Sequence, residues 1–266
     1  MKTAVITGSS RGIGYGLARE LLKRCANVVV TGRSQEAVDK AVAELGQPDR
    51  VLGVACDVTD AADVQALWDA SVARFGRVDI WINNAGTTTN PVPLWEVGSD
   101  EVKQTVETNL LGALYGMQVA AKGMRAQGGG QIFNVEGMGS KGPRKSEVQV
   151  GLLPYACTKA AVGYLDKAFL KELKGSSVQV CSIRPGINVT EHLLHGSEHL
   201  DPARWEKTKK VFNILGDLPE TTTPWLAERI LATTKTGTRI AWLSPPKIAW
   251  RFTVAPFRKR DLFANA

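Results

Sequence analysis

The stretch Thr3-Ala-Val-Ile-Thr-Gly-Ser-Ser-Arg-Gly-Ile-Gly14 decides the fold of this 266-residue chain. Its first five residues form a β-branched run, which predicts a buried strand. Three glycines follow and open a helical pattern. Gly8 permits a tight turn, Gly12 lets the backbone approach a pyrophosphate, and Gly14 permits close helix packing. A strand, a glycine-rich turn and a helix in this order predict a dinucleotide-binding βαβ unit, in which free helix N–H groups face the phosphates.

Short β-branched runs and helical patterns alternate along the rest of the chain, which is typical of a parallel sheet with crossover helices. Because the connections are short, we predict a single α/β domain over residues 1–245, a Rossmann-like doubly wound parallel sheet. The predicted strands are Thr3–Thr7, Asn27–Thr31, Val51–Cys56, Val78–Asn83, Gln131–Val135, Val178–Ile183 and Arg239–Trp242. The predicted helices are Gly12–Arg24, Gln35–Leu45, Ala61–Phe75, Glu101–Ala126, Tyr155–Leu173 and Trp225–Thr233.

Two segments interrupt this alternation. Residues 136–154 form a long loop rich in glycine and lysine, and residues 188–218 follow the sixth predicted strand without a clear strand of their own. In an open α/β sheet, ligands bind beyond the carboxyl ends of the strands, where both segments emerge. We therefore expect an active-site loop and, over about residues 188–218, a lid.

The net charge of +7 is mostly scattered, except in the C-terminal tail over residues 246–266. There, basic residues alternate with aromatic ones: Arg251, Arg258, Lys259 and Arg260 with Trp250, Phe252, Phe257 and Phe263. Such a tail suits a membrane surface or an oligomer interface, and both readings stay open. The four cysteines are far apart and fit neither a disulfide scaffold nor a zinc site. Without a leader or a run long enough to span a membrane, we expect a soluble or peripheral protein.

The end of the second predicted strand distinguishes the two nicotinamide dinucleotides. An NAD enzyme usually places a carboxylate there against the ribose 2′-hydroxyl, but this chain has Thr31-Gly32-Arg33-Ser34. The guanidinium of Arg33 suits a 2′-phosphate, and Arg11 in the glycine loop can face the same phosphate from the other side. We predict NADP(H) as the cofactor; the alternative is that each arginine is an ordinary surface charge.

Several ordered motifs resemble the short-chain dehydrogenase/reductase family. Thr7–Gly14 fits its glycine pattern, Asn83–Gly86 its Asn-Asn-Ala-Gly turn, and Tyr155–Lys159 its Tyr-x-x-x-Lys signature. Asp57-Val58 matches an adenine-contacting pair, and Pro185-Gly186 matches the turn that holds the nicotinamide. The resemblance covers about residues 1–245. It implies a cofactor site made of Gly8, Ser10, Arg11, Gly12, Ile13, Gly14, Arg33, Asp57, Val58, Asn84, Ala85, Gly86, Tyr155, Lys159, Pro185, Gly186 and Thr190.

Tyr155 and Lys159 lie four residues apart, which places them on one face of a helix. A tyrosine titrates near pH ~10 in water, so we expect the ammonium of Lys159 to favour the phenolate and lower the pKa of Tyr155. The resemblance implies that Tyr155 delivers a proton to a carbonyl as the nicotinamide delivers hydride, and that Lys159 also holds the nicotinamide ribose. It further implies that Asn109 fixes a water that links Lys159 to solvent.

The loop after the fifth predicted strand departs from the family pattern. The family usually has two serines there, and the second donates a hydrogen bond to the substrate oxygen, whereas this chain has Glu136-Gly137. Without that donor the developing alkoxide would depend on Tyr155 alone. We predict that Ser140, three residues further on, takes the place of the missing serine. The alternative is a loop serine with no catalytic role.

This altered loop resembles that of chlorophyll b reductases, where an acidic residue and a glycine replace the serine pair, and residues 212–220 and 241–246 resemble the same subfamily. The resemblance implies NADPH-dependent reduction of the 7-formyl group of chlorophyll b or chlorophyllide b to 7-hydroxymethyl. It also implies a homo-oligomer without nucleic acid, located in the cytoplasm or peripherally on a thylakoid membrane. Two alternatives stay open: reduction of another bulky carbonyl or hydroxy compound, and an NADP-binding sensor or scaffold with little turnover.

The three histidines fall together in the predicted lid, at spacings of three and four that place them on one helical face: His192, His195 and His199. One reading is a metal site or a ligand to the magnesium of a macrocycle. The other is that they are polar lid residues. We favour the second and predict no metal, because Tyr155 polarises the carbonyl without one.

Overall fold

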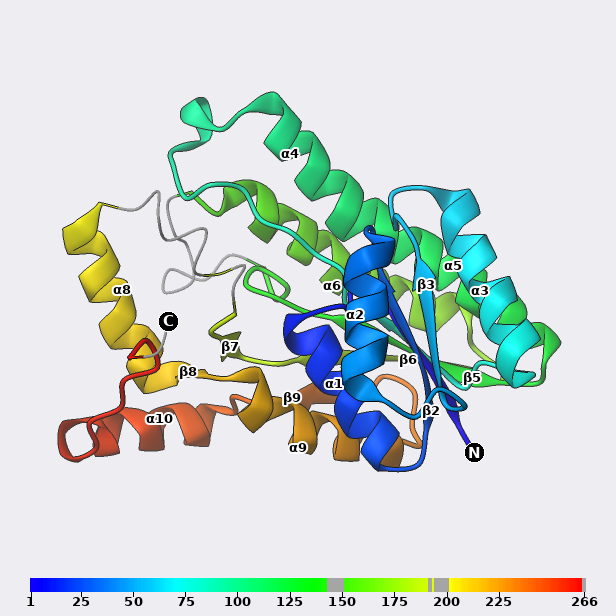
Figure 1. The fold of residues 1–266 in the computed structure, drawn as a ribbon. Helices are drawn as coiled ribbons and strands as arrows, with labels where there is room; N and C mark the ends of the chain where they lie inside the picture. Colours follow the sequence, from blue (N-terminus) through cyan, green and yellow to red (C-terminus); the bar gives the residue numbers. More distant parts are fainter. Residues whose placement is uncertain (143–150, 191–192, 194–200, 265–266) are drawn as a thin grey trace.

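The structure, a computed structural model, describes residues 1–142, 151–190, 193 and 201–264. Its centre is a seven-stranded parallel sheet with the strand order β3-β2-β1-β4-β5-β6-β9 (Figure 1). The order reverses between β1 and β4, which is the switch point of a doubly wound sheet. The predicted single Rossmann-like domain is confirmed. The strands are β1 (Thr3–Ile6), β2 (Asn27–Gly32), β3 (Val51–Ala55), β4 (Ile80–Asn83), β5 (Gly130–Val135), β6 (Val178–Arg184) and β9 (Arg239–Ala241).

Helices cover both faces of this sheet, so apolar residues of its strands face both helical layers. Ala4 and Ile6 face one helical layer and Val5 faces the other, and all three side chains are fully buried. The first layer consists of α1 (Gly12–Lys23), α2 (Gln35–Leu45) and α9 (Pro219–Ala232). The second consists of α3 (Ala61–Phe75), α5 (Gly112–Ala126) and α6 (Leu153–Glu172).

The helix predicted over Glu101–Ala126 is a composite of three segments. α4 (Ser99–Val106) runs into a single π-helical turn, η2 (Glu107–Leu111), and then into α5. Apolar periodicity does not reveal such a turn, because the helix continues on both sides of it. A short 3₁₀ segment, η1 (Leu94–Glu96), precedes α4.

The predicted lid contains regular structure that the sequence pattern did not indicate. β7 (Ile187–Asn188) pairs in parallel with β8 (Gly216–Asp217), and α8 (Pro202–Leu215) leads into β8. The expectation that this segment has no strand of its own is therefore wrong at both of its ends. Strands of two residues are too short for a period of two to show in the sequence.

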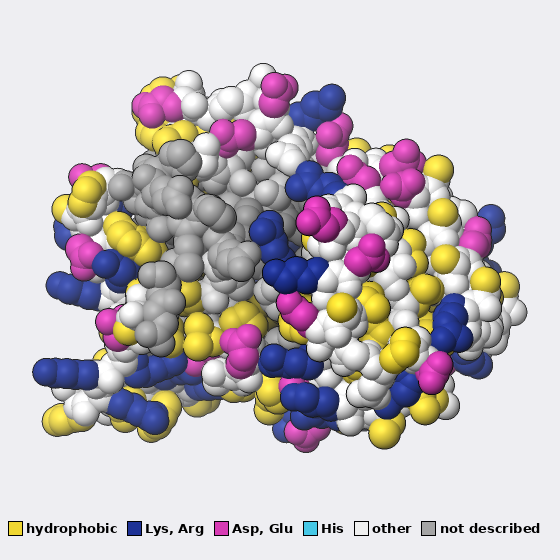
Figure 2. Space-filling view, in the orientation of Figure 1, with side chains coloured by type: hydrophobic (Ala, Val, Ile, Leu, Met, Phe, Trp, Pro, Cys, Tyr) yellow, Lys and Arg dark blue, Asp and Glu magenta, His cyan; other side chains and the backbone are white. Residues whose placement is uncertain are grey.

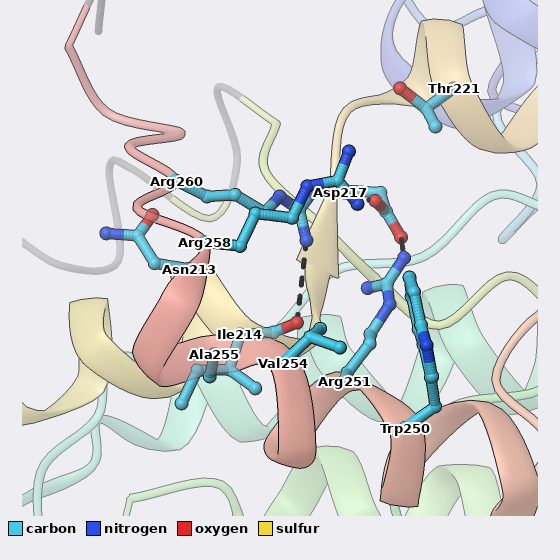
Figure 3. Close-up of a pocket in the computed structure, with 10 residues that line it drawn as sticks. All are labelled: Asn213, Ile214, Asp217, Thr221, Trp250, Arg251, Val254, Ala255, Arg258 and Arg260. Carbon is cyan, nitrogen blue, oxygen red and sulfur yellow. Dashed lines mark hydrogen bonds and ion pairs between the residues drawn. The ribbon is translucent and has the colours of Figure 1, made fainter.

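The C-terminal tail is helical and packs against α8 and β8, at the end of the predicted lid. It consists of α10 (Pro245–Val254) and the 3₁₀ segment η3 (Ala255–Phe257). Figure 3 shows the side chains of Arg251 and Arg260 converging on the carboxylate of Asp217, which is 2 % exposed. Arg251 donates to Asp217 at 2.6 Å, Arg260 at 2.9 Å, and the indole of Trp242 at 2.6 Å. The tail is thereby joined to β8.

Candidate active site

The glycine loop after β1 is closed by the turn that follows β4. Gly8 has a φ of +61°, and a Cβ on it would lie 2.8 Å from the Cα of Ala85. A Cβ on Gly14 would lie 2.5 Å from the carbonyl oxygen of Gly8. The side-chain amide of Asn84 donates to the carbonyl oxygens of Thr7 at 2.9 Å and Gly8 at 3.0 Å. Only glycine fits these positions, and the structure brings the predicted loop and turn together at the switch point.

α1 begins at Gly12, directly beyond this loop, with Ile13 half-buried against the core. Arg11 at the N-cap has an extended backbone and forms no side-chain cap, and this helix, which the structure describes in full, has no acidic residue in its first turn. The uncapped N–H groups and the positive end of the helix dipole suit a diphosphate. The methyl group of Thr190 lies 3.6 Å from where a Cβ on Gly12 would stand. The residues present therefore fit the phosphates of a dinucleotide.

The same loop lies against the carboxyl end of β2, which carries Arg33. The Oγ of Ser10 is 2.9 Å from the position of a Cβ on Gly32. The amide of Ser9 donates to the carbonyl oxygen of Thr31 at 2.7 Å, and the Oγ of Ser9 accepts the amide of Thr31 at 2.9 Å. These contacts place the loop that carries Arg11 next to Arg33, and both arginines are exposed. Ser9 is fully buried, and nothing in its sequence context indicated this bridging role.

Asp57 and Val58 stand beyond the end of β3, where the resemblance expects an adenine contact. The carboxylate of Asp57 accepts hydrogen bonds from the backbone amide of Thr59 at 2.9 Å and from its hydroxyl at 2.8 Å. Val58 is buried, and a Cβ on Gly112 would lie 2.8 Å from its side chain. Hydrogen bonds and packing thus hold both residues just beyond β3, and their contact with adenine stays a prediction.

The predicted catalytic pair, Tyr155 and Lys159, lies at the start of α6. Lys159 is 6 % exposed, and its ammonium donates to the carbonyl oxygen of Val135 at 3.0 Å and lies 5.8 Å from the centre of the Tyr155 ring. Gly137 lies against this ring, because a Cβ on it would overlap the hydroxyl of Tyr155 and come within 3.0 Å of the Cγ of Lys159. The space that a serine would use at position 137 is therefore occupied by the phenol.

Burial controls the ionisation of this pair. It raises the pKa of Tyr155 to about 12, with the positive charge of Arg184 acting in the opposite direction. It lowers the pKa of Lys159 to about 8, with the negative charge of Glu136 acting in the opposite direction. The expectation that the ammonium lowers the pKa of Tyr155 is therefore wrong for this structure, because loss of hydration disfavours the phenolate more than nearby cations favour it. The phenol keeps its proton at neutral pH, as a proton donor requires.

Asn109 ties the turn after β4 to α6 from within the π-helical turn. It is 2 % exposed, and its Oδ1 accepts the amide of Thr87 at 2.7 Å. Its Nδ2 donates to the carbonyl oxygen of Thr87 at 2.8 Å and to the hydroxyl of Thr158 at 3.1 Å. A Cβ on Gly86 would lie 3.2 Å from the Oδ1 of Asn109 and 3.7 Å from the ammonium of Lys159. π-Helical turns occur frequently at functional sites.

Ser140 is buried in the loop after β5, and its hydroxyl closes that loop. The Oγ donates to the carbonyl oxygen of Gly137 at 2.8 Å and accepts the amide of Gly137 at 3.0 Å. A hydroxyl has a single proton, so donation to a substrate requires the Ser140 hydroxyl to turn away from Gly137. Its role as a substitute donor stays a prediction.

The turn after β6 is held on both sides. Gly186 has a φ of +80°, and a Cβ on it would lie 3.1 Å from the ring of Trp242. The amide of Asn188 donates to the carbonyl oxygen of Pro185 at 3.0 Å, and its Oδ1 accepts the hydroxyl of Thr222 at 2.7 Å. The lid histidines, His192, His195 and His199, lie outside the described residues.

A glycine-rich loop at the switch point that fits the phosphates of a dinucleotide, with a tyrosine–lysine pair beside it, is typical of a dehydrogenase with a doubly wound sheet. The chain belongs to the short chain dehydrogenase family, whose model matches residues 2–200. It is 36 % identical to a probable chlorophyll(ide) b reductase, chloroplastic, of Arabidopsis thaliana, over 98 % of this chain and 54 % of the relative. It is also 36 % identical to a second chlorophyll(ide) b reductase, chloroplastic, of the same plant, over 88 % of this chain and 66 % of the relative. The chain spans about half the length of the first of these relatives.

Solved structures of the family have the same fold. An actinorhodin polyketide ketoreductase with NADPH is 27 % identical, with a TM-score of 0.79 over 91 % of this chain and 95 % of that one. A 3-ketoacyl-(acyl-carrier-protein) reductase of Brucella melitensis complexed with NADH is also 27 % identical, with a TM-score of 0.75 over 91 % and 96 % of the two chains. The family therefore binds nicotinamide dinucleotides of both kinds on this fold. Among the described helices, none is both long and apolar enough to cross a membrane.

Proposed function

We propose that this chain is an NADPH-dependent carbonyl reductase that reduces the 7-formyl group of chlorophyll b or chlorophyllide b to 7-hydroxymethyl. The observation that carries the substrate assignment is the extent of the similarity to chlorophyll(ide) b reductases. It runs over 98 % of the chain, well beyond the residues 2–200 that the family model matches. The similarity thus includes α8, α9 and the tail, which lie outside the family match. Gly137 supports the assignment, because it leaves no side chain between the phenol and a bulky ring.

Bound NADPH supplies the hydride, and the residues of the chain supply the proton and the orientation. In this proposal Tyr155, which keeps its proton at neutral pH, donates it to the carbonyl oxygen as the carbonyl carbon is reduced to the alcohol. Lys159 stands behind the phenol with its ammonium fixed on Val135, and it holds the nicotinamide ribose. Asn109 fixes the turn through which the proton is restored from solvent.

NADPH is the proposed cofactor because the glycine loop and the end of β2 meet where the 2′-phosphate would lie. Arg33 and Arg11 provide two guanidinium groups there, which suit a phosphate better than a hydroxyl. A reductase of another bulky carbonyl remains the alternative. A sensor with little turnover is disfavoured, since Tyr155, Lys159 and Asn109 are all in place.

The test is a single-turnover and steady-state assay of the purified protein with NADPH and a carbonyl panel that includes chlorophyll b and chlorophyllide b, with the products separated by pigment chromatography. We expect the 7-hydroxymethyl product. Tyr155→Phe should lower kcat by about 10²-fold or more while NADPH still binds, because it removes the acid and keeps the ring. Tyr164→Phe is the matched control, since Tyr164 is on the same helix with its side chain 72 % exposed. Turnover of a small aldehyde with none of either pigment would overturn the substrate assignment.

We also propose that the protein is a homo-oligomer and that its tail contacts the membrane surface at which the pigment is held. Trp250, Phe252 and Phe257 are 52 %, 50 % and 90 % exposed. Figure 2 shows hydrophobic and basic side chains together at the end of the molecule where α10 lies. Aromatic rings beside Arg258 and Lys259 suit the boundary between anionic headgroups and acyl chains.

A further inference from the structure

Glu136 is a buried acidic residue at the end of β5 that the proposed reaction does not use. It is 8 % exposed, and both of its carboxylate oxygens are held by Arg239, through Nε at 2.8 Å and through Nη2. Arg239 opens β9, which is separated from β5 by β6. A buried ion pair contributes little net stability, because the loss of hydration offsets the attraction between the charges. The position of the carboxylate therefore calls for another explanation.

The carboxylate is one residue away from the group that holds the catalytic ammonium. The carbonyl oxygen of Val135 accepts the ammonium of Lys159 at 3.0 Å, and the next backbone amide, that of Glu136, donates to the carbonyl oxygen of Ile183 at 2.7 Å. The backbone hydrogen bond to β6 and the two-point contact with Arg239 fix this strand end. Any shift of Glu136 would therefore move the carbonyl oxygen on which Lys159 rests.

The charge of Glu136 acts on Lys159 in the direction that catalysis needs. Burial raises the pKa of Glu136, but hydrogen bonds from Arg239 and Ser182 and the charges of Arg239 and Arg184 outweigh it, so the group is ionised at neutral pH. Burial alone would discharge Lys159 further, and the negative charge of Glu136 opposes this effect. An ammonium without such a charge nearby would lose its proton at a lower pH.

Other titratable groups surround this pair on each packed element. Tyr155 lies beside Lys159 on α6, and Arg184 and Arg239 lie at the ends of β6 and β9. Asp166 of α6 accepts from the amide of Asn134 at 2.5 Å, and burial, together with the charge of Glu136, raises its pKa to about 6. Asp166 thus changes charge below the range in which Lys159 does, so the two titrations are separable.

We propose that Glu136 is a positioning residue for Lys159, an inference that rests on the proposed reductase function. Glu136, held by Arg239, fixes the carbonyl group of Val135 that accepts the hydrogen bond of the Lys159 ammonium. Its buried negative charge also keeps this ammonium protonated. The residue that stands in place of the family's first serine therefore acts through Lys159 and does not touch the substrate.

The test measures the dissociation constant of NADPH by fluorescence titration from pH 6 to pH 10 at constant ionic strength. This readout needs no pigment, so it is independent of the substrate assignment. In the wild type, binding should weaken along an alkaline limb as Lys159 loses its proton, and Lys159→Met should remove that limb. Glu136→Gln should move the limb to lower pH by roughly one unit, because one nearby charge typically shifts a pKa by that amount or more.

Glu20→Gln is the matched control. Glu20 is 5 % exposed and is held by Lys23 at 2.9 Å and Arg24 at 2.7 Å, but it lies on α1 away from Lys159. In the Glu20→Gln variant, the alkaline limb of NADPH binding should coincide with that of the wild type. The double variant Glu136→Gln/Arg239→Met removes both partners of the ion pair, so it should fold even if the single variant does not. Its alkaline limb should also move to lower pH, by less than in the single variant, because the loss of the Arg239 cation partly offsets the loss of the carboxylate. An unshifted limb in whichever of these two variants folds overturns the proposal.

Discussion

Gly137 is the residue at which the site differs most in shape from one with a serine pair, because the phenol of Tyr155 occupies the space of a side chain there. Gly137→Ser should therefore displace the phenol, and we expect kcat for chlorophyllide b to fall at least about 10-fold. Gly98→Ser is the control, since a Cβ at this N-cap of α4 meets nothing within 4 Å. A Gly137→Ser enzyme as active as the wild type on chlorophyllide b would show that the phenol has room to move.

Arg33 is the residue that should select between the two nicotinamide cofactors. Arg33→Asp replaces a guanidinium that suits the 2′-phosphate of NADPH with a carboxylate that suits the 2′-hydroxyl of NADH. NADPH binding should therefore weaken by about 10-fold or more, while NADH binding stays unchanged or improves. The dissociation constants of NADPH and NADH for the wild type and the variant test this prediction. Arg125→Asp makes the same change of charge at an exposed position on α5 and should affect neither. Equal weakening of both cofactors by Arg33→Asp would mean that the 2′-phosphate does not contact this residue.

At the scale of elements, the sequence predicted those whose ends carry a local signal. α2 and α3 have the predicted bounds because Ser34 and Asp60 cap their first turns, and Gly46 and Gly76 end them. The π-helical turn at Asn109 and the two-residue strands β7 and β8 have no such signal. α9 does begin with one, Pro219 at its first position, but Pro224 inside the helix favoured the later predicted start at Trp225. The features of the site likewise fall into those with a local sequence signal and those without one.

The glycine loop and the tyrosine–lysine pair follow from spacing along the chain, so they were open to prediction. The upward shift of the pKa of Tyr155 depends on burial by distant segments. The hydrogen bond of Asn109 to Thr158 joins the π-helical turn to α6, two segments far apart in the sequence. Such features arise only when the elements pack together, and for that reason no local pattern indicated them.

Asp217 joins the lid to the tail, and its loss should loosen both elements. Asp217→Asn leaves Arg251, which is 8 % exposed, without its buried counter-charge. We expect the free energy of unfolding to fall by about 3 kcal/mol, the usual scale for breaking one partner of a buried ion pair. Glu206→Gln on α8 is the matched control. The side chain of Glu206 is 63 % exposed, so its ion pair with Lys209 should contribute below about 1 kcal/mol to the free energy of unfolding. Urea unfolding curves of the two variants measure the difference, and equal stabilities would mean that Arg251 and Arg260 find other partners.

At the scale of the whole molecule, the residues of the proposed site lie at the edge of the sheet formed by the carboxyl ends of its strands. The glycine loop and the turn after β4 lie at the switch point between β1 and β4, and Arg33 follows the end of the neighbouring strand β2. Tyr155 and Lys159 of α6 lie beside the end of β5, where Lys159 contacts Val135. The lid reaches the same edge through β7, and Asp217 connects it to α10.

The tail provides the last prediction, because its exposed rings and basic residues suit an anionic lipid surface. Purified protein should sediment with vesicles that contain anionic lipid, and less so at high salt, since screening weakens contacts of Arg258 and Lys259 with headgroups. Trp250→Ser/Phe257→Ser should reduce the bound fraction several-fold. Trp95→Ser is the control, because Trp95 on η1 is 86 % exposed and lies away from the tail. If the wild type stays in the supernatant and the double variant instead elutes at a smaller mass in size-exclusion chromatography, the tail closes an interface between copies of the chain and does not bind a membrane.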